Sequence, residues 1–420
     1  MSYEISTVGA LIGLALSIVL IMKKIPPAYG LILGAVVGGL LGGGGLTDTV
    51  AMMIEGVRDM ISPVLRILTS GVLVGALIRT RSTDKIAEVI VKKCGQRHAI
   101  SAIAVATMVI CAIGVFIPIA VITVAPIAIA IGIRAGLSKT GILVAMLGGG
   151  KAGNIISPNP NTIAVADTFS LDLTALMLKN VVPALAALAV TILISTFLSK
   201  KAGDEIEKTD FAGETAQMLP PLWAALCGPI VVMGLLLLRP VCGVVIDPLI
   251  ALPVGGVVCI LATGHVKHLM SCLEFGIGKV TGVCILLLST GTVAGVIKAS
   301  SLQNDVIHLL ELVNMPTFLL APLSGILMAC ATASTTAGAT IASQTFGETL
   351  VNAGVPALFA GAMIHAGAVV LDSMPHGSFF HATAGAVNMN MKDRMKIIPF
   401  EALTGIAAVV ISVALYLLAH

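Results

Sequence analysis

Apolar stretches of about 20 residues recur along the whole 420-residue chain, and this feature limits the possible folds more than any other. A helix of about 20 apolar residues is long enough to cross the hydrocarbon core of a bilayer. Only 11% of the residues are charged, whereas soluble domains have about 25%. This composition excludes a soluble enzyme and a disordered chain, and a net charge of +3 excludes a nucleic-acid binder. The sequence therefore predicts an all-α polytopic membrane protein.

The apolar stretches fall into two kinds. Two long stretches, 99–133 and 317–352, are interrupted midway by polar, Gly or Pro residues, and we interpret them as re-entrant hairpins. The other ten read as full-length spans, and two of these are broken by prolines at mid-membrane. The ten spans are 5–22, 28–46, 60–79, 140–166, 178–198, 220–238, 247–263, 280–297, 356–388 and 399–418.

The distribution of basic residues predicts that both termini lie outside. Segment 79–98 carries six Lys/Arg residues, whereas 167–176 and 299–316 carry acidic residues and no Lys/Arg. Basic loops face the cytoplasm, so we place 79–98 inside and the two acidic segments outside. This placement is possible only if both hairpins dip into the membrane and return to the side on which they began. Arg239 is the exception to this pattern.

A repeated pattern divides the chain into two halves. Residues 68–78 resemble 288–297, and a proline-broken span follows each of them at a similar distance. With five spans in the first half, the second half starts on the opposite side of the membrane, which is an inverted-topology repeat of about 5+5 helices. We expect an N-terminal repeat over 1–200, a cytoplasmic linker over 201–219 and a C-terminal repeat over 220–420.

The first broken span carries a dense set of polar side chains. Three consecutive glycines at 148–150 and two prolines at 158 and 160 are incompatible with a continuous helix, so backbone groups are exposed to a cavity. Lys151 is a charge inside an apolar span, where it either attracts a substrate carboxylate or extends toward the cytoplasmic surface. The amides and hydroxyls that follow suit a hydroxylated carboxylate: Asn154, Ser157, Asn159, Asn161 and Thr162.

The second broken span and the second hairpin complete the expected site. Asp372 and His376 lie four residues apart around a proline. A dry environment disfavours the charged form of both groups, so the pair suits a proton relay, although a structural pair bracing a broken helix is the alternative. Ser373, with Ser334, Thr335 and Thr336 at the middle of the second hairpin, is expected to contact the substrate.

With these residues in place, the chain resembles the GntP family, the gluconate:proton symporters. The resemblance covers most of the length and includes Asp372, Ser373, Pro375, His376 and Gly377 in the penultimate span. It implies proton-coupled uptake of a small organic acid such as gluconate across the inner membrane, without a prosthetic cofactor. In this interpretation Asp372 and His376 handle the coupling proton.

Three alternatives stay open at the level of sequence. Carbonyl groups at unwound helix ends also bind sodium, so the chain is alternatively a sodium-coupled organic anion transporter. A passive channel is a second alternative, and an intramembrane enzyme, for which we find no arranged catalytic groups, is a third. No metal site is expected, because the eight cysteines form no CxxC pair. The expected partners are the organic anion, the coupling ion and the lipid bilayer, and we allow for a homodimer.

Overall fold

The computed structural model describes residues 5–94, 98–199, 218–302, 305, 308, 312, 315–375 and 377–420. Within these ranges the chain is helical, and an isolated β-bridge joins Ile5 to Ser300. By length and composition, six helices of the described part could cross a membrane: Ile61–Arg79, Ile117–Ala135, Val181–Leu198, Leu222–Arg239, Val266–Lys298 and Met391–Leu417. The prediction of an all-helical membrane protein is confirmed.

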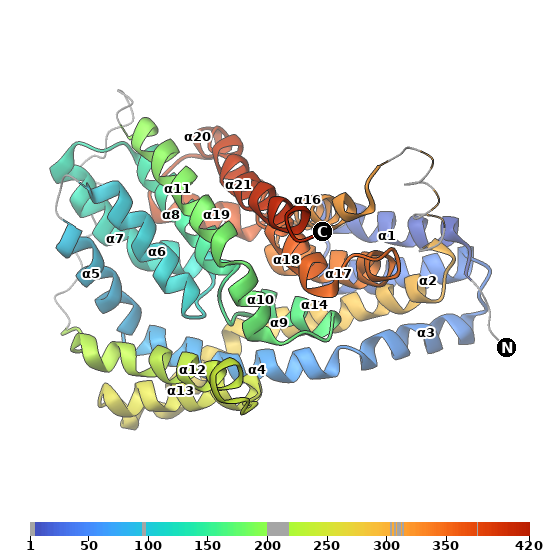
Figure 1. The fold of residues 1–420 in the computed structure, drawn as a ribbon, viewed down its shortest axis with the longest axis horizontal. Helices are drawn as coiled ribbons and strands as arrows, with labels where there is room; N and C mark the ends of the chain where they lie inside the picture. The colour runs from blue at the N-terminus through green and yellow to red at the C-terminus, as the bar shows by residue number, and fades with distance from the viewer. Residues whose placement is uncertain are drawn as a thin grey trace.

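Figure 1 shows the helices coloured along the chain, from α1 in blue to α21 in red. The first half contains α1 (Thr7–Met22), α2 (Pro27–Leu41), α3 (Leu46–Arg58), α4 (Ile61–Arg79), α5 (Ser82–Cys94), α6 (Ala99–Ala112), α7 (Ile117–Ala135), α8 (Lys139–Asn154), α9 (Pro160–Thr168), α10 (Leu173–Lys179) and α11 (Val181–Leu198). The second half contains α12 (Leu222–Cys242), α13 (Pro248–Ala262), α14 (Leu269–Lys298), α16 (Leu320–Thr332), α17 (Thr335–Asn352), α18 (Ala357–Ala368), α19 (Ser378–Ala386), α20 (Met391–Met395) and α21 (Ile398–Leu417).

Glycine residues of α3 and α4 contact glycine residues of α14, and these contacts relate the two halves of the chain. A Cβ atom on Gly56 would lie 2.0 Å from the carbonyl oxygen of Gly291, so the two backbones touch. A Cβ atom on Gly276 would lie 1.9 Å from the carbonyl oxygen of Gly71. An offset of 220 residues relates Gly56 to Gly276 and Gly71 to Gly291, so the two contacts are equivalent. The contacts also show that α14 runs antiparallel to α3 and α4. The contact is therefore self-complementary, as expected for two equivalent helices related by an approximate two-fold axis.

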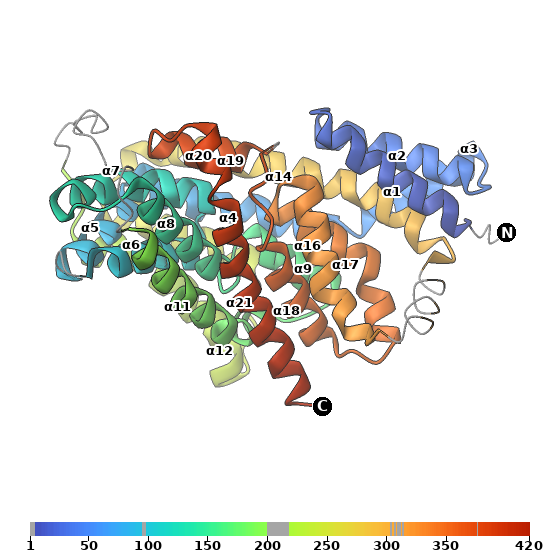
Figure 2. The same cartoon turned by 90° about the horizontal axis from the view of Figure 1, so that it is seen from above.

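Both predicted hairpins are present. The first consists of α6 and α7, joined by a short turn in which Gly114 has φ +112°, a value that favours glycine. The second consists of α16 and α17, and its turn holds Ala333 at φ +50°. Figure 2 shows the two hairpins in different parts of the molecule, with α21 crossing beside α11 between them.

The two predicted helix breaks are confirmed. Helix α8 ends at Asn154 and α9 begins at Pro160, whereas α18 ends at Ala368 and α19 begins at Ser378. Proline suits the first turn of α9, because its missing N–H has no partner there. Helix α8 is the central helix of the first half, and every residue from Gly141 to Asn154 is buried.

Two expected spans differ from the structure in their extent. The expected span 28–46 ends at Leu41, and a separate amphipathic helix, α3, follows it. The expected span 280–297 is the second part of the 30-residue helix α14. The predicted linker 201–219 lies almost entirely outside the described residues.

Candidate functional site

A pocket of about 250 Å³ lies where the tips of the two hairpins meet the two broken spans. The first hairpin contributes apolar residues from Phe116 to Ile119. The second hairpin and the broken spans contribute amides and hydroxyls, which are Asn154, Asn161, Ser334, Thr335, Thr336 and Ser378. One wall of the pocket is formed by Lys279 and Val283 of α14. Segments separated by more than 200 residues thus build one polar cavity.

Four helices begin at this pocket. The first turns of α7, α9, α17 and α19 each supply lining residues. Helix N-termini carry partial positive charge and unpaired N–H groups. Asn159 and Ser334 cap α9 and α17 with their side chains, but α7 and α19 have no side-chain cap. This arrangement favours binding of an anion, whose oxygens accept the free N–H groups.

An asparagine cluster fixes the first break and joins it to the second hairpin. The side-chain oxygen of Asn159 accepts the backbone N–H groups of Asn161 at 2.9 Å and of Thr162 at 3.1 Å. Asn159 also donates to the backbone carbonyl of Asn154 at 2.9 Å. The hydroxyl of Thr336 donates to the side-chain oxygen of Asn161. The S-P-N-P sequence produces this cap because asparagine before a first-turn proline favours an N-cap conformation.

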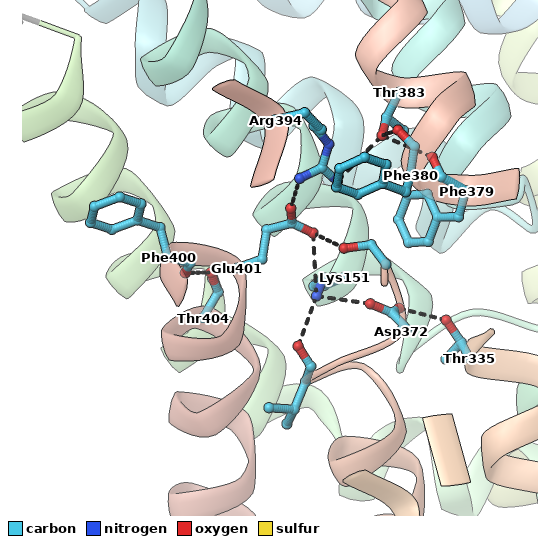
Figure 3. A network of polar contacts seen from close by, with 12 residues as sticks. Lys151, Thr335, Asp372, Phe379, Phe380, Thr383, Arg394, Phe400, Glu401 and Thr404 are labelled. Carbon is cyan, nitrogen blue, oxygen red and sulfur yellow. Dashed lines mark hydrogen bonds and ion pairs between the residues drawn. The ribbon is translucent and has the colours of Figure 1, made fainter. Parts of the chain in front are cut away.

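Directly behind the pocket lies a buried ion pair between Lys151 and Asp372 (Figure 3). Lys151 Nζ lies 2.8 Å from Asp372 Oδ1, and it donates to the carbonyl oxygen of Val370 at 3.2 Å. Both charged side chains are at most 1% exposed. Thr335 lines the pocket and donates its hydroxyl to Asp372 Oδ2 at 2.6 Å. A single hydroxyl therefore connects the cavity to the ion pair.

A second buried ion pair extends this cluster. Arg394 of α20 pairs with Glu401 of α21, and the Arg394 guanidinium carbon lies 4.7 Å from the centre of the Phe380 ring. Glu401 Oε2 accepts the hydroxyl of Ser373 at 2.5 Å and lies 3.7 Å from Lys151 Nζ. Two positive and two negative groups thus form one buried, electrically balanced network (Figure 3). Such intramembrane charges are typical of functional sites.

The structure separates the predicted site residues into three groups. The pocket brings together Asn154, Asn161, Ser334, Thr335 and Thr336. Lys151, Asp372 and Ser373 belong to the charge network behind it, and Lys151 neither lines the pocket nor reaches the surface. Asn159 and Thr162 support the first break, and the buried Ser157 hydroxyl has no partner among the described residues. His376 lies outside the described residues.

Sequence reasoning missed Glu401, Arg394, Ser378 and Lys279. Glu401 is a single carboxylate in an otherwise apolar span, which is the same signal that identified Lys151. Arg394 is one of three basic residues between 392 and 396, and nothing in the sequence indicates that it is buried. Among the described residues, no three His, Cys, Asp or Glu side chains are grouped closely enough to hold a metal ion.

A second cavity, of about 320 Å³, lies beside the middle of α17. Its lining includes Asp59, Lys298, Ser343 and Gln344. Beside it, Arg66 of α4 pairs with Asp167 and with Asp247, the latter at 2.8 Å. These pairs join α4 to the end of α9 and the start of α13.

Comparison with known proteins identifies related sequences and a related fold. Residues 5–419 match the family described as GntP family permease. An uncharacterized transporter of Haemophilus influenzae is 48% identical over 412 residues, which is 98% of each chain. The D-serine transporter DsdX of Escherichia coli is 21% identical over 351 residues, which is 78% of this chain and 79% of that protein.

Among solved structures, the chain resembles the Alcanivorax borkumensis YdaH transporter, whose crystal structure is described as having an unusual topology. The TM-score is 0.67 at 14% sequence identity, and the match covers 94% of this chain and 97% of that chain. At this identity the likeness concerns the fold alone.

Proposed function

The chain belongs to the GntP family of permeases, and from this premise we propose that it is a proton-coupled symporter of a small hydroxylated carboxylate, such as gluconate, in the inner membrane. The observation that carries the proposal is the convergence of four helix N-termini on one polar cavity between the two hairpin tips. Two of these N-termini, those of α7 and α19, have no side-chain cap, which favours a carboxylate as their partner. The amides of Asn154 and Asn161 and the hydroxyls of the second hairpin suit the hydroxyl groups of such a substrate.

The name of one relative widens the substrate class to be tested. D-serine, like gluconate, combines a carboxylate with a hydroxyl group. Both molecules are small enough for a cavity of about 250 Å³. We therefore include hydroxy acids and amino acids in one set of candidate substrates.

Coupling is proposed to occur at Asp372. When a proton binds the Asp372 carboxylate, the side chain becomes neutral and its ion pair with Lys151 is lost. Lys151 keeps its own proton and turns to Glu401 Oε2, which is 3.7 Å away. The Thr335 hydroxyl, no longer held by a carboxylate 2.6 Å away, becomes available to the substrate. Proton binding and substrate binding thereby favour each other, which is the requirement for symport.

The repeat supports alternating access. We propose that residues 1–200 and 220–420 form the two repeats, joined by a linker over 201–219, and that Ser157, Ser373 and His376 act at the junction of the broken spans. Two halves of opposite orientation have inward-open and outward-open states of similar energy. The equivalent contacts of Gly56 with Gly291 and of Gly276 with Gly71 support this arrangement.

The test is uptake by the purified chain in proteoliposomes. Radiolabelled gluconate and D-serine are supplied with an inward proton gradient or an inward sodium gradient, and other small carboxylates compete. We expect accumulation above the external concentration with the proton gradient only. Accumulation driven by sodium would contradict proton coupling at Asp372, and equilibration without accumulation under either gradient would contradict secondary active transport.

A further inference from the structure

We propose that Lys279 recognises the carboxylate of the transported anion at the mouth of the substrate pocket. This inference rests on the proposed function and names a residue that determines its specificity. Lys279 is the only charged side chain among the described residues that line the pocket. Without it, the lining offers hydroxyls, amides and helix ends, which carry no formal charge.

The Lys279 side chain is free to bind a ligand. It is exposed, and it forms no ion pair with any described residue. Its ammonium lies 4.9 Å from the centre of the Phe275 ring, one helical turn away on α14. An aromatic face restrains an ammonium group without neutralising it. The positive charge therefore remains available to an anion that enters the pocket.

The two buried cations near the pocket, Lys151 and Arg394, already have partners. Lys151 lies 2.8 Å from Asp372, and Arg394 is paired with Glu401. Withdrawing either cation from its carboxylate would leave an uncompensated buried charge. Lys279 is therefore the lining residue that offers a full positive charge to the carboxylate of a substrate.

The residue that is equivalent to Lys279 in the first half of the chain has the opposite charge. The 220-residue offset that relates Gly56 to Gly276 also relates Asp59 to Lys279. Asp59 lines the second cavity, and its carboxylate lies 3.6 Å from Lys298 Nζ. The equivalent position in the first half therefore carries a negative charge beside a cation, whereas Lys279 forms no ion pair with any residue that the structure describes. The substrate pocket and the second cavity therefore present different charges to an anion.

Lys279→Gln and Lys279→Arg test this assignment in proteoliposomes, with radiolabelled gluconate and D-serine as probes. We expect Lys279→Gln to raise KM by about tenfold, which corresponds to about 1.4 kcal/mol, while kcat changes less than about threefold. Lys279→Arg should keep KM close to that of the wild type, because the charge is retained. Lys298→Gln is the matched control, since Lys298 lies on the same helix, is exposed and lines the other cavity. It should leave KM unchanged.

A charge-rescue experiment separates recognition from a structural role. Lys279→Cys is treated with a thiol reagent that adds an ammonium group or with one that adds a sulfonate. The ammonium should restore KM and the sulfonate should raise it further, and the treated wild type controls for native cysteines such as Cys242, which is exposed. An unchanged KM in Lys279→Gln, or equal effects of the two reagents, would overturn the role of Lys279. The proposed function would still stand if the wild type accumulates substrate, and it fails separately if the wild type does not.

Discussion

At the scale of single residues, the site depends on charges that are buried but mutually balanced. Lys151 and Asp372 are recognisable in the sequence because each interrupts an apolar span. Their pairing is not recognisable, because the two residues are 221 positions apart and only the packed fold brings them within 2.8 Å. The expectation that Lys151 attracts a substrate carboxylate considers this charge alone, whereas in the fold it is paired with Asp372.

The buried pair leads to a prediction about stability. Lys151→Met should lower the free energy of unfolding by about 3–5 kcal/mol, because it leaves Asp372 buried and unpaired. The double variant Lys151→Met, Asp372→Asn should recover most of that loss, since Arg394 and Glu401 still balance each other. Thermal unfolding in detergent can be followed by the reactivity of buried cysteines such as Cys111. Equal stability of the single variant and Lys298→Met, an exposed control, would contradict the ion pair.

At the scale of elements, prolines and glycines determine which helix boundaries can be predicted from the sequence. The break before Pro160 and the break at 369–377 were predicted because these sequences are incompatible with a continuous helix. The separation of α3 from α2 was not predicted, because the glycine-rich segment at 42–45 continues the apolar pattern without a charge. The asparagine cluster depends on contacts between the first break and the second hairpin, which no local pattern encodes.

The contact between Gly276 of α14 and Gly71 of α4 leads to a prediction that has a control on the same helix. Gly276→Ala should lower the free energy of unfolding by about 1–3 kcal/mol, because a Cβ atom there would lie 1.9 Å from a backbone oxygen. Gly278→Ala should be neutral or stabilising by up to about 1 kcal/mol, since no atom lies within 4 Å. The same cysteine-reactivity assay measures both. Equal effects of the two substitutions would contradict the close contact between α4 and α14.

At the scale of the whole molecule, the repeat explains why two unlike sequences build one site. The resemblance of 68–78 to 288–297 predicted the equivalence of α4 and α14, and the structure adds the antiparallel contact. The halves are chemically unequal: the first hairpin lines the pocket with Phe116, Ile117 and Pro118, and the second with hydroxyls. This asymmetry was visible in the sequence, whereas the charge network and Lys279 required the fold.

The central claim is that protonation of Asp372 couples transport to the proton gradient, and one comparison tests it most directly. Asp372→Asn and wild-type proteoliposomes are compared in two assays, accumulation of a substrate under an inward proton gradient and exchange of labelled for unlabelled substrate. Asparagine keeps the size of the side chain but cannot take up a proton near neutral pH. We predict that the variant no longer accumulates substrate but retains a measurable part of the exchange. Unchanged accumulation in the variant would contradict coupling at Asp372.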